Sequence, residues 1–262
     1  MTTVDIRVTQ GRVLRSEWVK LRSLRSSYIS LIGAFGAIVG LGLLFGMIVA
    51  NRWPYLDAEE RAFFDPTEVS LRGAYLAQLI IGVLGVLVVT GEYSTGMIRA
   101  SLSAAPNRLP VLWGKIGVFA AVTFAVTAVA ALIAFLGAQF LLSSQHIQTT
   151  LGAPGVPRAV LGSALYVTGV GLLGMALGWI IRHSAGAIGT VFGLLLILPL
   201  LAQALPESWH VQPYLPSNAG ARIMTMQPDA DTLAPWTGFA LFCGYLVVAV
   251  AVGAVLLRRR DA

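Results

Sequence analysis

The sequence has 262 residues, of which 56% are hydrophobic and only 11% charged, and its mean hydropathy is +0.78. A soluble domain of this length carries roughly a quarter charged residues, so the composition excludes a water-facing surface over much of the chain and indicates an integral membrane protein. The formal net charge of +6 does not indicate nucleic-acid binding, because the basic residues gather at the ends of apolar runs and not along one continuous face.

The first predicted element is an amphipathic helix over residues 11–27. At about 100° per residue, Leu14, Trp18 and Leu21 fall in one sector of the helix and most of the basic side chains lie outside it. Arg25 is the exception, since it projects from the apolar sector, where a long arginine side chain reaches the headgroups. The pattern predicts an interfacial helix that lies flat on the membrane, although a basic flank that only sets topology remains an alternative.

Six apolar segments follow, each long enough for a membrane span, which needs about 20 apolar residues. They are residues 28–50, 71–90, 111–142, 159–181, 185–203 and 236–257. The third is longer than a perpendicular span needs, so we expect it to tilt, bend or emerge into water. Only Arg182, His183 and Ser184 separate the fourth segment from the fifth, which predicts a tight hairpin.

The positions of lysine and arginine predict the orientation. With six spans, both termini lie on one side, and that side holds 13 basic residues against 5 on the other. The positive-inside rule therefore places both termini in the cytosol. We expect an all-α integral membrane protein with a cytosolic N-terminus and interfacial helix (1–27), a six-helix transmembrane domain (28–257) and a cytosolic tail (258–262).

Four pairs of glycines in these spans are spaced four residues apart, a pattern that lets helix backbones approach closely in lipid. The pairs are Gly36/Gly40, Gly42/Gly46, Gly174/Gly178 and Gly189/Gly193. They predict close packing of helices, either within the chain or between subunits.

The motifs of several catalytic and nucleotide-binding sites are missing from the sequence. The nearest fragment to a Walker A motif is Gly114-Lys115, but Ile116 follows where serine or threonine is required. H-E-x-x-H and G-x-S-x-G are missing too, the three histidines are scattered, and the single cysteine, Cys243, lies in an apolar run. We expect no catalytic residue, no metal site and no cofactor bound by this chain.

The polar residues inside the spans are uncharged, and we expect no buried charge there. A buried charge in a span usually marks an ion or proton path, so its absence counts against a proton-coupled transporter. The polar residues are Gln78, Thr123, Thr127, Gln139, Tyr166, Thr168, Thr190 and Gln203. Interhelical hydrogen bonding is one explanation for them. The other is a lining for a lipophilic or amphipathic substrate path, for which Gln78 is the best candidate, together with Thr123 and Thr127.

A polar segment, residues 91–108, joins the second span to the third on the predicted cytosolic side. Glu92 and Arg99 are seven residues apart, so they share a face if the segment is helical. Ser94 or Thr95 is suited to cap a helix start. From the spacing alone, both a short helix on which a soluble partner docks and a solvated loop remain open.

Two stretches resemble the permease subunits of ABC-2-type exporters, particularly the actinobacterial kind. Residues 14–27, LRSEWVKLRSLRSS, are similar to the opening SEWxKLRSxRS of those permeases. Residues 92–99, EYSTGMIR, are similar to their EYSxGxxR segment between the second and third spans. Six spans with cytosolic termini agree with the family across nearly the whole chain.

The resemblance implies that two permeases, identical or paralogous, pair in the plasma membrane and that each binds a separate cytosolic ATP-binding subunit, which holds ATP and Mg²⁺. It implies a coupling helix in contact with that subunit, formed by Glu92, Tyr93, Ser94, Thr95, Gly96 and Arg99. It also implies an elbow helix at the membrane surface, with Arg15, Trp18, Lys20, Arg22 and Arg25. The family often has a larger re-entrant feature between the last two spans, which residues 206–235 would hold here.

The predicted function is that of the permease subunit of an ATP-driven exporter for a drug, antibiotic, peptide or lipid. One alternative is a non-transporting membrane anchor or sensor partner, which leaves the polar segment without a role. A second is a membrane-embedded lipid-modifying enzyme, which requires paired acids, histidine or serine at one interface.

Overall fold

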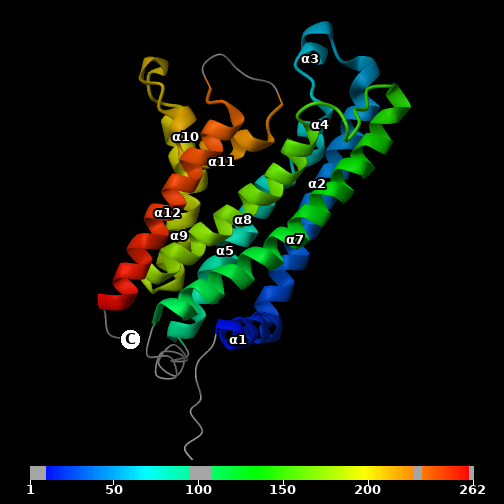
Figure 1. The fold of residues 1–262 in the computed structure, drawn as a ribbon. Helices are drawn as coiled ribbons and strands as arrows, with labels where there is room; N and C mark the ends of the chain where they lie inside the picture. The colour runs from blue at the N-terminus through cyan, green and yellow to red at the C-terminus, as the bar shows by residue number, and fades with distance from the viewer. Residues whose placement is uncertain (1–9, 95–107, 227–231, 260–262) are drawn as a thin grey trace, which may run out of the picture.

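The structure, a computed structural model, describes residues 10–94, 108–226 and 232–259. Within these ranges the chain forms helices and turns without any strand. Six helices there are long and apolar enough to cross a membrane, namely Arg25–Tyr55, Pro66–Ser94, Leu109–Gln145, Val156–Ile181, Ser184–Ala202 and Pro235–Arg259. Each overlaps one of the six predicted segments, so the all-α integral membrane fold is confirmed. Figure 1 shows α1 at one end of the bundle and α3 and α11 at the other.

The N-terminal part forms two helices, α1 (Gln10–Ser23) and α2 (Arg25–Arg52). They are separate because Leu24 between them is extended, with φ −85° and ψ 120°. In Figure 1, α1 lies across the lower end of α2 and α7. The helix expected over residues 11–27 is therefore present but ends at Ser23, and Arg25 begins the first span. That α1 lies on a membrane surface stays a prediction.

The third span, α7 (Arg108–Leu142), is one continuous helix of 35 residues. At about 1.5 Å per residue it is roughly 50 Å long, whereas the hydrocarbon core is about 30 Å thick. It therefore has to tilt or to emerge from the core, as its length in the sequence predicted. It runs beside α2 in Figure 1, and α4 (Pro66–Leu71) packs against both helices.

The centre of the bundle is the pair α5 (Ala74–Ser94) and α8 (Val156–Ile181), whose backbones touch. A Cβ atom added at Gly85 would lie 2.0 Å from the carbonyl oxygen of Gly171, and one added at Gly174 would lie 2.2 Å from that of Gly82. Larger residues would force the two helices apart. The close contact and the many buried residues of both helices place α5 and α8 at the centre of the bundle.

The four glycine pairs divide into two kinds. Gly42/Gly46 and Gly174/Gly178 pack inside the chain, where the added Cβ atoms would meet α4, α7 or α5 at 3.1 Å or less. A Cβ atom added at Gly36, Gly40, Gly189 or Gly193 would have no atom of another part of the described chain within 4 Å. The first two pairs thus serve internal packing, and the other two lie on open helix faces.

The fifth span is irregular and follows a tight hairpin. Arg182 ends α8 in the left-handed conformation, and His183 caps α9 (Ser184–Phe192) by accepting a hydrogen bond at Nδ1 from the Gly186 amide. This confirms the predicted hairpin. After α9 the chain forms a π-helical turn, η3 (Gly193–Ile197), and then α10 (Leu198–Ala202). Pro199 lacks an amide hydrogen, which explains why the regular α-helical ladder is interrupted here.

The segment between the fifth span and α12 (Pro235–Arg259) folds back on the bundle. Its elements are η4 (Glu207–Trp209), η5 (Gln212–Tyr214), α11 (Pro216–Ala221) and η6 (Arg222–Met224). Gly220 lies against the Tyr166 ring of α8, and Gly238 of α12 lies against the Ala219 carbonyl. Residues 206–235 therefore include a short helix that packs between α8 and α12.

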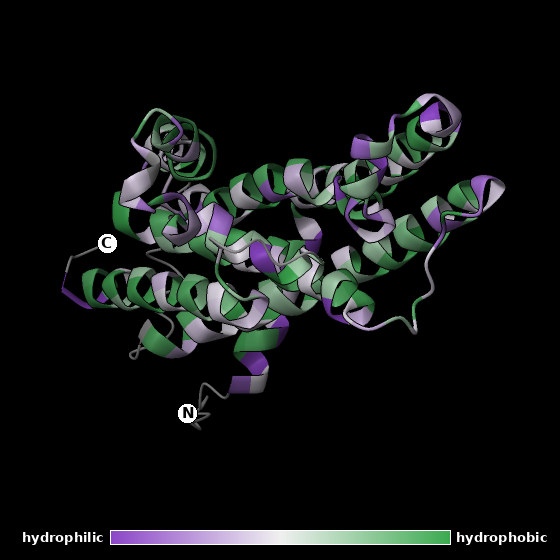
Figure 2. Ribbon diagram, turned by 90° about the horizontal axis from the view of Figure 1, so that it is seen from above, coloured by the Kyte–Doolittle hydropathy of each residue, from purple (hydrophilic) through white to green (hydrophobic). Residues whose placement is uncertain are grey.

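The remaining connections are short: η1 (Trp53–Tyr55), α3 (Ala58–Ala62) and η2 (Ser143–Gln145). Figure 2 shows hydrophilic residues concentrated in α1 and in connecting segments, while the long helices are mostly apolar along their length. This distribution fits helices that are surrounded by lipid.

Candidate functional site

Four charged side chains from three helices meet at the α1 end of the bundle. Glu17 and Lys20 come from α1, Glu92 from α5 and Lys115 from α7; we call this set the charge cluster. The Lys115 ammonium donates to Glu17 Oε2 at 2.6 Å and to Glu92 Oε1 at 2.8 Å. The Lys20 ammonium donates to Glu17 Oε1 at 2.7 Å and to Glu92 Oε1 at 3.0 Å. Each lysine thus bridges both carboxylates in a closed, charge-balanced ring.

Three members of the cluster are almost entirely buried. The side chains of Glu17, Glu92 and Lys115 are 4%, 7% and 6% exposed, and that of Lys20 is 28% exposed. Burial by itself lowers the pKa of Lys20, but the hydrogen bond to Glu17 and the charges of both glutamates outweigh it and raise that pKa above the usual 10.5. The attraction within the ring therefore keeps Lys20 charged.

Local packing explains how α1 comes close enough to α7 to form this cluster. Val13, Glu17 and Leu21 are spaced four residues apart and form the buried stripe of α1. Val13 packs on Gly114, where an added Cβ would lie only 2.7 Å from the valine side chain. The absence of a side chain at Gly114 allows the approach. Glu17, one turn after Val13 on α1, then reaches Lys115, the residue after Gly114 on α7.

The residues expected in the coupling helix are partly described. Glu92, Tyr93 and Ser94 form the last residues of α5, and the Ser94 hydroxyl donates back to the Gly91 carbonyl at 3.0 Å. The Tyr93 ring lies 5.1 Å from the Arg182 guanidinium. Thr95, Gly96 and Arg99 lie outside the described residues. Contact of these six residues with an ATP-binding subunit stays a prediction.

The residues expected in the elbow helix differ in their placement. The side chains of Arg15, Trp18, Arg22 and Arg25 are exposed. The Lys20 ammonium instead lies in the charge cluster. Contact of the exposed residues with a membrane surface stays a prediction.

The charge cluster is the feature that sequence reasoning missed. We expected the spans to carry no buried charge, and this is wrong at Lys115, which is 5% exposed and lies within the apolar segment 111–142. A lysine inside an apolar run was the available signal. A cavity of about 300 Å³ adjoins the cluster. Apart from the four charged side chains, most of the residues that line it are apolar.

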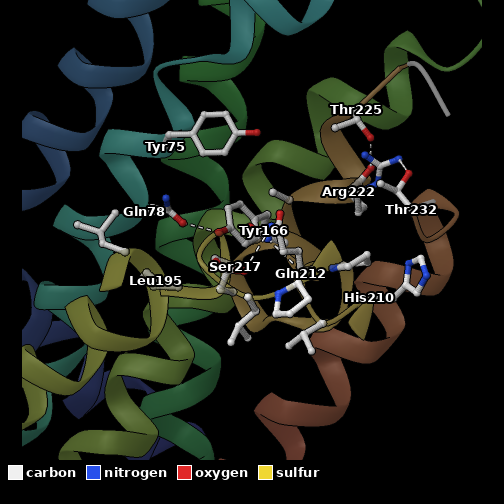
Figure 3. A pocket seen from close by; sticks show the side chains of 18 of the residues that line it. Tyr75, Gln78, Tyr166, Leu195, His210, Gln212, Ser217, Arg222, Thr225 and Thr232 are labelled. Atoms are coloured by element: carbon white, nitrogen blue, oxygen red, sulfur yellow. Dashed lines mark hydrogen bonds between the residues drawn. The ribbon is translucent and has the colours of Figure 1, made fainter. Parts of the chain in front are cut away.

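At the opposite end of the bundle lies a larger cavity of about 760 Å³, which we call the α11 cavity (Figure 3). Its walls come from α5, α8, the end of the fifth span and the segment around α11. The lining residues are Tyr75, Gln78, Tyr166, Leu195, Leu196, Ala202, Leu205, Pro206, Ser208, His210, Val211, Gln212, Pro213, Ser217, Asn218, Ala221, Arg222, Thr225 and Thr232. No carboxylate is among these described lining residues.

The polar groups of the α11 cavity are held in different ways. The fully buried Tyr166 donates its hydroxyl hydrogen bond to Gln78 Oε1. Arg222 donates to the Leu233 carbonyl at 3.1 Å and to the Thr232 hydroxyl, which ties residues 232–233 to η6. Ser217 is 6% exposed, and its hydroxyl has no hydrogen-bond partner within the described chain. An unsatisfied buried hydroxyl costs about 1–3 kcal/mol.

The three residues predicted for a substrate path are not together. Gln78 lines the α11 cavity. Thr123 and Thr127 are buried in α7 and do not line it, and the Thr127 hydroxyl donates to the Thr123 carbonyl at 2.8 Å. Interhelical bonding, the other explanation, holds at Gln139, whose Nε2 donates to Ser70 Oγ at 2.9 Å. A role of Gln78, Thr123 or Thr127 in transport stays a prediction.

Among the described residues, no group of three or more histidine, cysteine, aspartate or glutamate side chains is placed to hold a metal ion. The six apolar helices, the amphipathic α1 and a cavity of ligand size define the class: a multi-pass membrane protein with a small-molecule cavity and a buried charge network.

A family model described as "ABC-2 family transporter protein" matches residues 13–199, and the chain belongs to this family. The predicted resemblance to ABC-2 type permeases is thereby confirmed. Membership makes the chain a membrane component of a transporter and a permease subunit, not the ATPase, and implies association with a separate ATP-binding subunit. No curated protein matches the chain. The matched residues include the whole charge cluster, whereas the cavity wall from Ala202 onward lies outside them.

Proposed function

We propose that this chain is the permease subunit of an ATP-driven exporter that moves a lipophilic or amphipathic molecule out of the cell. A separate cytosolic subunit binds ATP and Mg²⁺ and docks on residues 92–99. A second permease, identical or paralogous, completes the path, and the open glycine pairs Gly36/Gly40 and Gly189/Gly193 offer surfaces for it. Both termini lie in the cytosol of a plasma-membrane protein.

The observation that carries this proposal is the position of the charge cluster at both ends of the polar segment. Glu92 lies two residues before the end of α5, and Lys115 lies seven residues into α7. The chain between these helices is the segment expected to dock the ATP-binding subunit. Both ends are bonded to α1 through Glu17 and Lys20. A displacement of the docked segment therefore reaches three helices at once.

The strength of the cluster is what makes it suited to transmit force. A solvent-exposed ion pair contributes about 0–1 kcal/mol and would yield under load. Removing one partner from a buried pair costs about 3–5 kcal/mol, because the remaining charge has lost its compensation. The cluster therefore moves as a unit, and rigid-body displacement of α1, α5 and α7 is the expected response to ATP-driven closure of the partner.

Two substitutions test the proposal in lipid, with the chain co-expressed with its candidate ATP-binding subunit. Gly96→Trp alters the docking segment at a residue that is not a member of the cluster, and we expect it to abolish co-purification of the ATPase. Glu92→Gln keeps a polar group of the same shape but removes its charge. We expect it to leave the ATPase bound while lowering the ATP turnover of the complex toward that of the isolated ATPase. Glu59→Gln, on exposed α3, is the matched control and should change neither quantity.

The exporter proposal fails if the ATP-binding subunit does not co-purify with the unsubstituted chain. If it does, but both Gly96→Trp and Glu92→Gln retain full binding and turnover, the role assigned to residues 92–99 is wrong. Direction is tested separately with inside-out vesicles, in which an exporter accumulates substrate in the lumen only when ATP is supplied.

A further inference from the structure

We infer that the α11 cavity is a binding site for an uncharged amphipathic molecule, whose polar group is held by Gln78 and Ser217 and whose apolar part lies against the end of the fifth span. The identification of this molecule as the transported substrate rests on the proposed function; the binding itself does not. Gln78 lies inside the matched family region, whereas Ser217 and the cavity wall from Ala202 onward lie outside it.

The size of the cavity matches a compact ligand. Its volume of about 760 Å³ falls within the roughly 300–1,000 Å³ of sites that bind small molecules. The walls are largely apolar where Leu195, Leu196, Leu205 and Val211 contribute. An apolar wall with a few convergent polar groups is the usual composition of such a site.

Two buried polar side chains of the cavity, Gln78 and Ser217, are available to a ligand. Ser217 faces the cavity in Figure 3, and its buried hydroxyl has no hydrogen-bond partner among the described residues. Gln78 accepts the Tyr166 hydroxyl at Oε1, which leaves its amide nitrogen to donate to a ligand. A bound carbonyl or hydroxyl would satisfy both groups, since each is already desolvated by the fold.

These groups are held in place before any ligand binds. The Tyr166 ring packs edge-on against Phe242, with ring centroids 5.6 Å apart, and Gly220 lies close to both rings. Tyr166 in turn fixes the Gln78 side chain through its hydroxyl. A preformed arrangement of this kind reduces the entropy lost on binding.

The charges of the cavity favour a neutral ligand. A cation would leave water without meeting a carboxylate among the described lining residues, and an uncompensated buried charge is unfavourable. The guanidinium of Arg222, the one lining cation among these residues, already donates to the Leu233 carbonyl and the Thr232 hydroxyl. Its use in the fold makes it a weak anchor for an anionic ligand.

Photo-crosslinking with three probes tests the inference on the full chain in lipid nanodiscs. The probes are diazirine-bearing hexadecanol, the headless hexadecane and the trimethylammonium analogue. Labelling is mapped by mass spectrometry as the ratio of residues 202–218, in the cavity wall, to residues 247–255 of α12, which include the exposed Val247, Val248, Val252 and Val255. We expect hexadecanol to raise this ratio at least threefold over both other probes.

Variants separate binding from folding. Gln78→Leu and Tyr166→Phe both remove the Tyr166–Gln78 hydrogen bond, but only Gln78→Leu removes the amide from the cavity. We therefore expect Gln78→Leu to abolish the hexadecanol enrichment and Tyr166→Phe to retain at least half of it. Ser217→Ala should reduce it, whereas Ser163→Ala, a buried serine of α8 that bonds the Val160 carbonyl and lies off the cavity, should not.

The outcomes are decisive for the cavity and independent of the ATPase. Equal ratios for hexadecanol and hexadecane, enrichment of the trimethylammonium probe, or equal losses in Gln78→Leu and Tyr166→Phe would each overturn the inference. If a variant fails to elute as a folded species, Ala202→Phe, which fills the cavity from the end of α10, supplies the test and should remove the enrichment. Enrichment without ATPase co-purification would retain the site but refute the exporter, and the reverse result would refute the site alone.

Discussion

Replacing Lys115 with methionine removes one cation from a ring of two ammonium groups and two carboxylates. In the native chain the Lys115 ammonium lies 2.6 Å from Glu17 and 2.8 Å from Glu92. After the substitution both carboxylates, 4% and 7% exposed, share only Lys20, and the ring keeps a net negative charge. An uncompensated buried charge costs about 3–5 kcal/mol, which shifts the unfolding equilibrium by roughly two to four powers of ten.

A second substitution distinguishes lost charge balance from lost packing. Glu92→Leu in the Lys115→Met background removes one charge of each sign and leaves the Lys20–Glu17 pair within α1. Apolar replacement of a whole buried pair is often close to neutral, so the double variant should recover most of the loss. The expected coupling free energy between the two sites is therefore at least about 2 kcal/mol in favour of the double variant.

Reversible unfolding in mixed micelles, followed by tryptophan fluorescence, measures these free energies. The control pair is Arg72–Glu68, whose closest atoms are 3.9 Å apart and whose side chains are 43% and 49% exposed. Its disruption should cost no more than about 1 kcal/mol. If Lys115→Met costs as little as this control, or if the two cluster substitutions are additive, the cluster is not a balanced buried network and the account of force transmission fails with it.

Three further predictions concern pH, packing and the loop contacts. Because the pKa of Lys20 is raised above 10.5 in the fold, its contribution to stability is fully present below pH 10.5 and is lost as the pH rises through the folded value; Lys20→Met should flatten this alkaline loss in thermal unfolding scans. Gly85→Val should lower the midpoint of thermal unfolding strongly, because its side chain would meet the Gly171 backbone, whereas Gly40→Val, with no atom within 4 Å, should change the monomer's midpoint little. Gln139→Leu should cost about 1–3 kcal/mol in the same unfolding assay, since Ser70 and the Thr149 amide each lose a partner; an unchanged free energy would show that these bonds are not formed.

The spans were predictable because hydropathy reports the solvent of each segment directly. The six predicted segments match the six helices, and the largest boundary differences arise where η1 (Trp53–Tyr55) follows the first apolar run and α4 (Pro66–Leu71) precedes the second. The π-helical turn at Gly193–Ile197 was not predicted, since the apolar run continues through it and only Pro199 marks the site.

The face of α1 that packs on the bundle was not predictable from the helical wheel. The wheel assigned Leu14 and Trp18 to the apolar face, but these are 42% and 47% exposed, while Val13, Glu17 and Leu21 are buried. Apolar side chains are stable both in lipid and in the protein interior. An amphipathic pattern therefore does not show which apolar side chains pack against the rest of the chain. The interior instead selected the stripe that carries Glu17, whose partner Lys115 is 98 residues away.

For the α11 cavity too, residues recognisable from their own segment were predicted, and residues whose burial depends on distant contacts were not. Gln78 was predicted as a candidate because a lone amide in an apolar run needs a partner or a role. Ser217 was not, because its burial depends on α11 folding back against Tyr166 and Phe242, and these contacts join segments that the sequence does not relate.

The charge cluster and the α11 cavity are joined by α5, whose backbone packs closely against that of α8. Glu92 and Gln78 lie on the same helix, α5, and the backbone contact between α5 and α8 prevents these helices from sliding past each other without losing their glycine packing. Ser184, which begins α9, also donates to Thr90 of α5 at 2.8 Å, so the fifth span that forms the cavity wall is anchored beside the charge cluster. Under the proposed docking at residues 92–99, we therefore expect a displacement that enters at Glu92 to reach the cavity walls formed by α5 and the fifth span. We then expect the ligand and the ATP-binding subunit to affect each other's binding. Thermodynamic linkage requires the two effects to be equal: the factor by which the subunit changes the affinity for the ligand is the factor by which the ligand changes the affinity for the subunit.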